Sequence, residues 1–223
     1  MLLQMLGSSS PSEILFNLLL LIPTLLISLT VHEVSHGWAA YKLGDPTARN
    51  LGRLSLNPIK HLDPIGAIML LLFGFGYAKP VPINTRYFGK PKRDIVLVSL
   101  AGPASNLVLA FFGMFFYLLC GKFISADNMY VMSAAVVFFS LFVSINVGLA
   151  IFNLIPIPPL DGSRLVTVLL PQKAMVWFFK YERYIQIILF ILLWRGFFDT
   201  PLYLARSFVI QGLVKIWSLL PIF

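Results

Sequence analysis

Long apolar runs separated by short polar loops restrict this chain to folds that a lipid bilayer can accommodate. The runs are Ile14–Leu29, Ile95–Cys120, Val131–Phe152, Ile185–Trp194 and Leu202–Leu220. A helix that crosses the hydrocarbon layer needs about 20 mostly apolar residues, and the fourth run reaches that length only if its helix begins near Met175. Charged residues make up 12% of the chain, which is about half of their share in soluble domains. We therefore expect an all-α integral membrane protein, a polytopic helical bundle with about five spanning helices.

The start of the first spanning helix is marked in the sequence. Ser10, Pro11 and Glu13 have the pattern of a capping box with proline at the first helical position. This pattern predicts a helix from about Ser12 to Leu43, which is long enough to cross a bilayer.

Basic residues are distributed unevenly among the loops. Nine lie between the first two apolar runs, four lie between the third and fourth, and the Gly121–Tyr130 loop holds one. By the positive-inside rule, this distribution predicts a multi-pass protein of the cell membrane (plasma or inner) with its N-terminus outside and both basic regions in the cytoplasm. The net charge of +8 then reflects topology, and we do not expect nucleic-acid binding. The basic residues are Lys42, Arg49, Arg53, Lys60, Lys79, Arg86, Lys90, Lys92 and Arg93 in the first region, Lys122 in the loop, and Arg164, Lys173, Lys180 and Arg183 in the second region.

The segment between the first two spanning runs contains two shorter elements. Pro64–Phe75 is apolar but too short to cross a bilayer, which is typical of a re-entrant or interfacial segment. Gly74–Asn84 is rich in glycine and proline. Its spacing suits a small β-hairpin in which Val81–Asn84 is an edge strand.

No stretch of the chain is polar and long enough to form a separate soluble domain. We expect a single membrane-embedded domain over residues 1–223. Its core would cover about residues 12–171, and its C-terminal helices residues 174–220.

The first helix carries the sequence His-Glu-Val-Ser-His at residues 32–36. Side chains four residues apart lie on one face of a helix, so His32 and His36 can bind one metal ion while Glu33 accepts a proton from metal-bound water. The alternative is a pair of histidines near the membrane interface beside a solvated glutamate. Charged groups at membrane depth are costly and mark functional sites, which favours the metal site.

A third ligand is expected at Asp161. This residue ends a stretch with three prolines in four positions, directly after the third apolar run. Prolines exclude a helix there, and irregular backbone at membrane depth lines a cavity or is buried in protein. The alternative role for Asp161 is to cap a short helix that opens at Ser163. Glu182 and Asp94 are weaker candidates for the third ligand.

Several motifs in order resemble the site-2 protease family of intramembrane metalloproteases, in particular small prokaryotic members without a PDZ or CBS domain. The resemblance covers roughly Thr30–Pro171. Beyond residues 32–36, it rests on Gly52–Pro58 with His61, Asp63, Pro64 and Gly66, then on Ala78–Asn84, Ala101-Gly102-Pro103-Ala104-Ser105-Asn106, and Asn153 to Gly162.

This resemblance implies one Zn²⁺ per chain, bound by His32, His36 and Asp161, with Glu33 as the general base. It also implies that Asn153 holds the substrate or stabilises the oxyanion, whereas the residues alone leave a hydrogen bond between helices equally open.

Two further polar residues in these motifs have less defined roles. We expect Asn106 to make a structural polar contact. His61 is expected to be hydrogen-bonded or solvated, and to support the metal site indirectly at most.

The resulting prediction is an intramembrane zinc metalloprotease that hydrolyses peptide bonds in or near transmembrane segments of membrane-anchored proteins, with its active site towards the cytoplasm. The alternatives are a metal-ion transporter and a catalytically inactive membrane scaffold. A transporter would show internal repeats and polar residues on several helices. An inactive scaffold would have no need of an intact base and ligand set.

Overall fold

The computed structural model describes residues 10–73, 78–124 and 129–220. All regular secondary structure in these ranges is helical. Its α-helices are α2 (Pro11–Lys42), α3 (Thr47–Asn50), α4 (Pro64–Phe73), α5 (Pro91–Lys122), α6 (Met129–Asn153), α7 (Asp161–Leu169), α8 (Gln172–Lys180), α9 (Glu182–Trp194) and α10 (Asp199–Trp217). Two single 3₁₀ turns, η1 (Pro58–Lys60) and η2 (Thr85–Tyr87), complete the set.

Three helices, α2, α5 and α6, are long and apolar enough to cross a membrane. Helices α9 and α10 pass the same test only as a pair, and they are bent by 80° at their junction, so the described chain has three spans or up to four. This finding confirms a multi-pass helical protein, but it does not confirm about five spans. The short α4 agrees with the prediction of an apolar helix that cannot cross.

The predicted start of the first helix is confirmed. The Ser10 hydroxyl oxygen accepts a hydrogen bond from the Glu13 N–H, and the Glu13 carboxylate accepts one from the Ser10 N–H at 2.9 Å. This reciprocal pair is the capping box, and Pro11 occupies the first helical position. The bounds of α2 differ from the prediction by one residue at each end.

The fourth apolar run would span only with a helix that begins near Met175, and this condition is not met, because the chain leaves helical geometry at Tyr181, between α8 and α9. Helix α9 therefore has only 13 residues, too few to cross a bilayer. Gly196 ends this helix with a φ of +72°, and the next N–H, of Phe197, bonds back to the Leu192 carbonyl. Glycine adopts this left-handed conformation without steric cost, so α10 leaves in a new direction.

The predicted β-hairpin is also not supported. Residues 78–84 contain no strand, and the remaining hairpin residues, 74–77, lie outside the described part of the chain. Pro80 and Pro82 lack an N–H and so cannot donate along one edge of a ladder. Two carboxylates hold this segment instead: Val81 N–H donates to Glu33 Oε2 at 2.9 Å, and Asn84 N–H donates to Asp45 Oδ2 at 2.6 Å.

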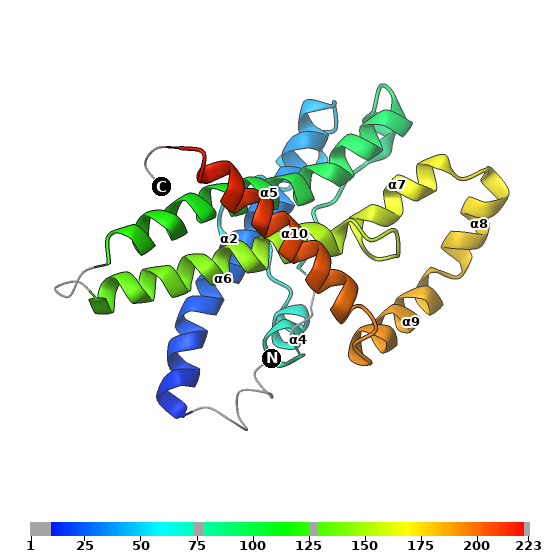
Figure 1. Cartoon of the computed structure of the whole chain (residues 1–223). Helices are drawn as coiled ribbons and strands as arrows, with labels where there is room; N and C mark the ends of the chain where they lie inside the picture. Colours follow the sequence, from blue (N-terminus) through cyan, green and yellow to red (C-terminus); the bar gives the residue numbers. More distant parts are fainter. Residues whose placement is uncertain (1–9, 74–77, 125–128, 221–223) are drawn as a thin grey trace.

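The centre of the fold is the contact between α5 and α6, which lie side by side while α10 crosses them (Figure 1). Its buried residues are Ala110, Met114, Val143 and Val147. Helix α2 packs against α5, and α5 also contacts α7. These contacts bring the middle of α2 and the start of α7 to the same region of α5.

Candidate active site

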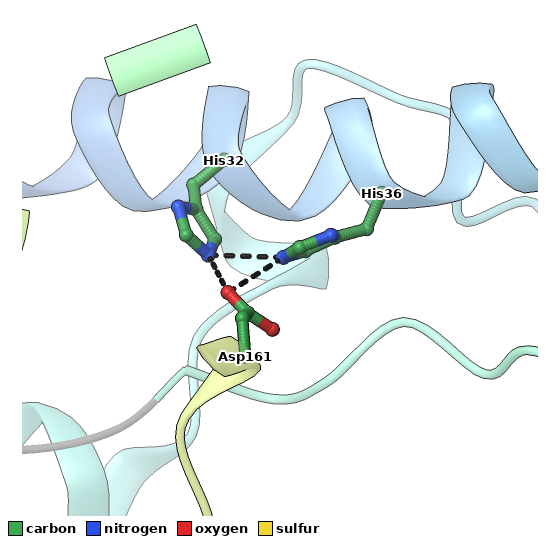
Figure 2. A group of neighbouring side chains, drawn as sticks. All are labelled: His32, His36 and Asp161. Carbon is green, nitrogen blue, oxygen red and sulfur yellow. Dashed lines mark hydrogen bonds and ion pairs between the residues drawn. The ribbon is translucent and has the colours of Figure 1, made fainter. Parts of the chain in front are cut away.

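Three side chains from distant parts of the sequence converge at the junction of α2, α5 and α7. His32 and His36 point from adjacent turns of α2 towards the Asp161 carboxylate at the start of α7 (Figure 2). Both Nε2 atoms lie close to Asp161 Oδ2, at 3.0 Å for His32 and 3.1 Å for His36, and they lie 3.0 Å from each other. The sequence prediction that these three residues share one site is therefore matched by their geometry.

Hydrogen bonds behind the two rings orient them. His36 Nδ1 lies 2.7 Å from the Val98 carbonyl oxygen, which can only accept, so this nitrogen carries a hydrogen in the neutral ring. His32 Nδ1 lies 2.6 Å from Asn106 Oδ1 and donates in the same way. In the neutral rings, both Nε2 lone pairs therefore point at each other and at the carboxylate.

Such a convergence of acceptors fits a bound cation. In tetrahedral zinc sites the metal lies about 2.0–2.1 Å from nitrogen and oxygen ligands, which places ligand atoms about 3.3 Å apart. The observed separations of 3.0–3.1 Å are close to this value. His32, His36 and Asp161 form the one group in the described ranges whose ligand atoms could jointly hold a metal ion.

The charge of the carboxylate suits the same role. Burial by itself raises the pKa of Asp161. In the metal-free site, His32 and His36 in their protonated form donate hydrogen bonds to the carboxylate and place positive charge beside it, which outweighs burial and lowers the pKa below its ordinary value. Asp161 is therefore ionised at neutral pH and supplies a negative charge to the site.

Gly102 on α5 provides the space beside the imidazoles. A Cβ added there would collide with His36 Nε2 and would lie 2.6 Å from His32 Nε2. No side chain larger than hydrogen fits between the backbone of α5 and the two nitrogen atoms, so this glycine makes the room in which the imidazoles lie.

We predict that Gly102→Ala displaces the imidazoles and abolishes zinc retention and cleavage. Gly121→Ala on the same helix is the matched control, because nothing lies within 4 Å of an added Cβ there. Zinc content per purified chain and cleavage of a single-span substrate are the measurements. Wild-type zinc content in Gly102→Ala would contradict the proposed role of this glycine.

The local backbone explains how Asp161 reaches the site. Helix α7 begins at Asp161 itself, and Ser163 N–H donates to the Leu160 carbonyl rather than to the aspartate. The alternative in which Asp161 caps a helix opening at Ser163 is therefore wrong. Gly162 is packed so closely that a Cβ would collide with the Leu154 carbonyl and lie 2.5 Å from that of Ile155, which fixes the path of the loop beside the aspartate.

The two weaker ligand candidates lie in other interactions. Asp94 forms an ion pair with Arg93 at 2.7 Å and accepts a hydrogen bond from the Lys90 N–H. Glu182 accepts a hydrogen bond from Gln186 on α9. Neither belongs to the cluster around Asp161.

Glu33 follows His32 on α2 and is half-buried. One of its carboxylate oxygens, Oε2, accepts the Val81 N–H, so the extended segment 78–84 holds the side chain from the loop side. Val81 also packs on α2, where a Cβ at Gly37 would lie 3.0 Å from the valine Cγ1. The predicted general base is thereby kept at the edge of the site.

Two other predicted residues, Asn153 and His61, hydrogen-bond to backbone carbonyls. Asn153 is half-buried at the end of α6, and its Nδ2 donates to the Leu149 carbonyl at 3.0 Å. His61 is buried and its Nε2 donates to the Ser55 carbonyl at 2.8 Å, which confirms the expectation of a hydrogen-bonded histidine.

Sequence reasoning missed two residues that matter for the site. Gly102 was noted only as part of a motif, and Asn146 on α6 was not noted at all. Asn146 accepts a hydrogen bond from Asn106 at 2.8 Å, and Asn106 in turn contacts His32. A polar residue within an apolar span is costly, and this signal could have identified Asn146.

Comparison with known proteins identifies the family. The sequence model of peptidase family M50 matches residues 20–195. The chain belongs to peptidase family M50. It is 46% identical over 186 residues to a Bacillus subtilis (strain 168) protein named "Putative zinc metalloprotease YwhC", covering 82% of this chain and 81% of YwhC.

More distant M50 relatives are longer proteins. "Putative zinc metalloprotease Rip2" of Mycolicibacterium smegmatis is 35% identical over 153 residues, which cover 65% of this chain and 54% of Rip2. Rip2 of Mycobacterium tuberculosis (H37Rv) is 34% identical over 143 residues, which cover 61% of this chain and 52% of Rip2. The chain thus spans about half the length of Rip2. No solved structure gives a significant match.

Family membership, the relatives and the apolar helices together make this chain an intramembrane zinc metalloprotease. Its metal is zinc, and the cluster at the start of α7 is able to bind it. The findings do not favour the transporter or the inactive scaffold.

Proposed function

We propose that this M50 protease is an endopeptidase that cleaves membrane-anchored proteins in or near their transmembrane segments. His32, His36 and Asp161 would hold the zinc ion, and Glu33 would be the general base. The observation that carries the proposal is the convergence of two imidazole lone pairs and one ionised carboxylate within 3.1 Å of one another, beside a glutamate on the same helix.

The metal and Glu33 would have different roles in the reaction. Zinc, when bound, polarises the scissile carbonyl and lowers the pKa of its bound water to about 7. Because Val81 N–H holds Oε2 of Glu33, Oε1 is the oxygen free to take a proton from the attacking water. Glu33 then returns this proton to the leaving amine. The water-to-amine transfer needs a base within hydrogen-bond reach of both atoms.

Asn153 would supply a hydrogen bond to the substrate or to the oxyanion. It lies on the last turn of α6, immediately before the loop that leads to Asp161. An amide can stabilise developing negative charge without adding a charge of its own. Its side chain now donates to the Leu149 carbonyl, so substrate binding would have to exchange that partner.

The test of the proposed reaction is to map the cut. Purified protein in detergent is incubated with a single-span substrate, and both products are identified by mass spectrometry. We expect two fragments that meet at one bond in or beside the span, no products with a zinc chelator, and recovery when zinc is restored. Stepwise removal of terminal residues would contradict an endopeptidase.

We also propose that residues 1–223 form one membrane-embedded domain with the N-terminus outside and the active site towards the cytoplasm. The support is the distribution of basic residues, since Lys and Arg are enriched in cytoplasmic loops. The segment after α2 is rich in them, whereas the α5–α6 connection holds Lys122 alone.

Labelling of single cysteines tests this orientation. In a Cys120→Ser background, we expect an impermeant maleimide added to intact cells to label Ile124→Cys but not Leu51→Cys, since both positions are exposed in the structure but would face opposite sides. Permeabilised cells, in which both should react, are the control. The reverse pattern on intact cells would invert the orientation.

A further inference from the structure

Two asparagines lie behind His32 in the middle of apolar helices. Asn106 of α5 and Asn146 of α6 are both completely buried, with 0% of their surface exposed. Apolar helices can pack against each other without any amide side chains. A buried amide is tolerated when each of its donors and acceptors has a hydrogen-bond partner. The direction of their hydrogen bonds shows what this pair does.

A backbone carbonyl orients the amide of Asn146, and Asn146 together with a second backbone carbonyl orients the amide of Asn106. Asn146 Nδ2 donates to the Phe142 carbonyl at 2.9 Å, so its Oδ1 faces Asn106. Asn106 Nδ2 donates to that oxygen at 2.8 Å and to the Ser28 carbonyl at 3.2 Å. Both hydrogens of Asn106 are thereby used, and its Oδ1 is left to face His32 Nδ1 at 2.6 Å.

The two histidines differ in how their tautomers are fixed. His36 faces the carbonyl of Val98, which cannot turn round and cannot donate. His32 faces an amide, which presents either an oxygen or an NH₂ group depending on which way it is turned. If Asn106 turned, its NH₂ would donate to Nδ1 and the ring hydrogen of His32 would move to Nε2, where it would block a metal.

We propose that Asn146 is a positioning residue for the zinc site: together with the Ser28 carbonyl it fixes the orientation of Asn106, and through it the tautomer of His32 that leaves Nε2 free for metal. This inference rests on the proposed role of His32 as a ligand. Asn146 belongs to α6 and its side chain bonds to Asn106 and to the Phe142 carbonyl, so its effect on zinc would pass through the amide of Asn106. Partners of metal-bound histidines set the ring tautomer and change metal affinity by about 10–100-fold.

The experiment measures zinc affinity of the purified full chain by competition with a chelating zinc indicator. Asn146→Leu should weaken zinc binding by about 10–100-fold. Asn146→Asp should bind within a few-fold of wild type, because a protonated carboxyl in this apolar setting donates to Phe142 and accepts from Asn106. Val147→Ala is the packing control, since this buried neighbour loses contacts without touching the amide chain, and it should keep its affinity.

A second background separates orientation from packing. In Asn106→Asp, the proton of the buried carboxyl can sit on either oxygen, so an accepting oxygen can face His32 whichever way the group is turned. Adding Asn146→Leu in this background should therefore change zinc affinity by less than about threefold. An equal loss from Asn146→Leu in both backgrounds would assign Asn146 to packing and overturn the proposal. Unchanged affinity in the folded Asn146→Leu protein would overturn it as well.

A spectroscopic measurement reads the tautomer without zinc or activity. Nitrogen NMR of histidine-labelled metal-free protein should show His32 with hydrogen on Nδ1 in wild type and Val147→Ala, and with hydrogen on Nε2 or a mixture in Asn146→Leu. The same tautomer in all three would overturn the proposal. His32→Ala is the reference for the ligand assignment: if it retains wild-type zinc affinity, the proposed ligand set is wrong whatever the asparagines do.

Discussion

Glu33→Gln is expected to lose cleavage by about 10²–10⁴-fold, the range that general base catalysis contributes, while keeping about one zinc per chain. The amide has the shape of the carboxylate and its oxygen can still accept the Val81 N–H, which now binds Glu33 Oε2. It cannot accept a proton from water. Because Glu33 lies outside the three-residue group that could hold the metal, the substitution separates proton transfer from metal binding.

The measurement pairs zinc content with the initial rate of cleavage of one single-span substrate in detergent. Glu182→Gln is the matched control, since it makes the same chemical change on α9, where Glu182 accepts a hydrogen bond from Gln186. This variant should retain both properties. A Glu33→Gln protein that binds zinc and cuts at the wild-type rate would remove Glu33 from the mechanism.

Asp161→Asn is expected to lose cleavage because it weakens metal binding, whereas Glu33→Gln removes the proton acceptor and leaves the metal bound. The carboxylate provides the only charge among the three proposed ligands and lies 3.0–3.1 Å from both imidazoles. A neutral amide presents less charge to a divalent ion, so zinc affinity should fall by more than the roughly 100-fold that marks the upper range for indirect partners. Cleavage should decline with zinc occupancy and recover in part at high zinc concentration.

The control for this change is Asp199→Asn, an exposed aspartate at the start of α10, which should bind zinc as wild type does. Equilibrium dialysis against buffered zinc measures both variants. Asp161→Asn and Glu33→Gln should then both have a low rate of cleavage, but only Asp161→Asn should have a reduced affinity for zinc. Undiminished zinc affinity in Asp161→Asn would mean that another group completes the site.

The parts of the site that local spacing determines could be predicted from the sequence. His32 and His36 share a face of α2 because four residues make about one helical turn, and Asp161 follows an apolar run whose end is marked by prolines. Sequence spacing could place them at a similar membrane depth, whereas their close approach depends on the packing of α2 and α7 against α5. The start of α2 was predictable as well, since a capping box involves only neighbouring residues.

The features that were missed depend on tertiary contacts. Residues 78–84 have the composition of a hairpin, yet Glu33 and Asp45 take the N–H groups that a partner strand would use. Hydropathy left open a helix from Met175 through Tyr181, because it carries no information on the breaks that divide α8, α9 and α10. The importance of Gly102 and Asn146 appears only once α5 and α6 lie beside α2.

The ligands proposed for zinc come from helices that are far apart in the chain, since 129 residues separate His32 from Asp161. A metal ion bound to both would act as a cross-link between the first helix and the segment that follows α6. Ligands that bind only the folded state stabilise it by mass action, by about 2.7 kcal/mol at a free concentration one hundred times the dissociation constant. Zinc would then contribute to the thermal stability of the folded chain as well as to its chemistry, and cellular zinc supply would influence how long each molecule survives in the membrane.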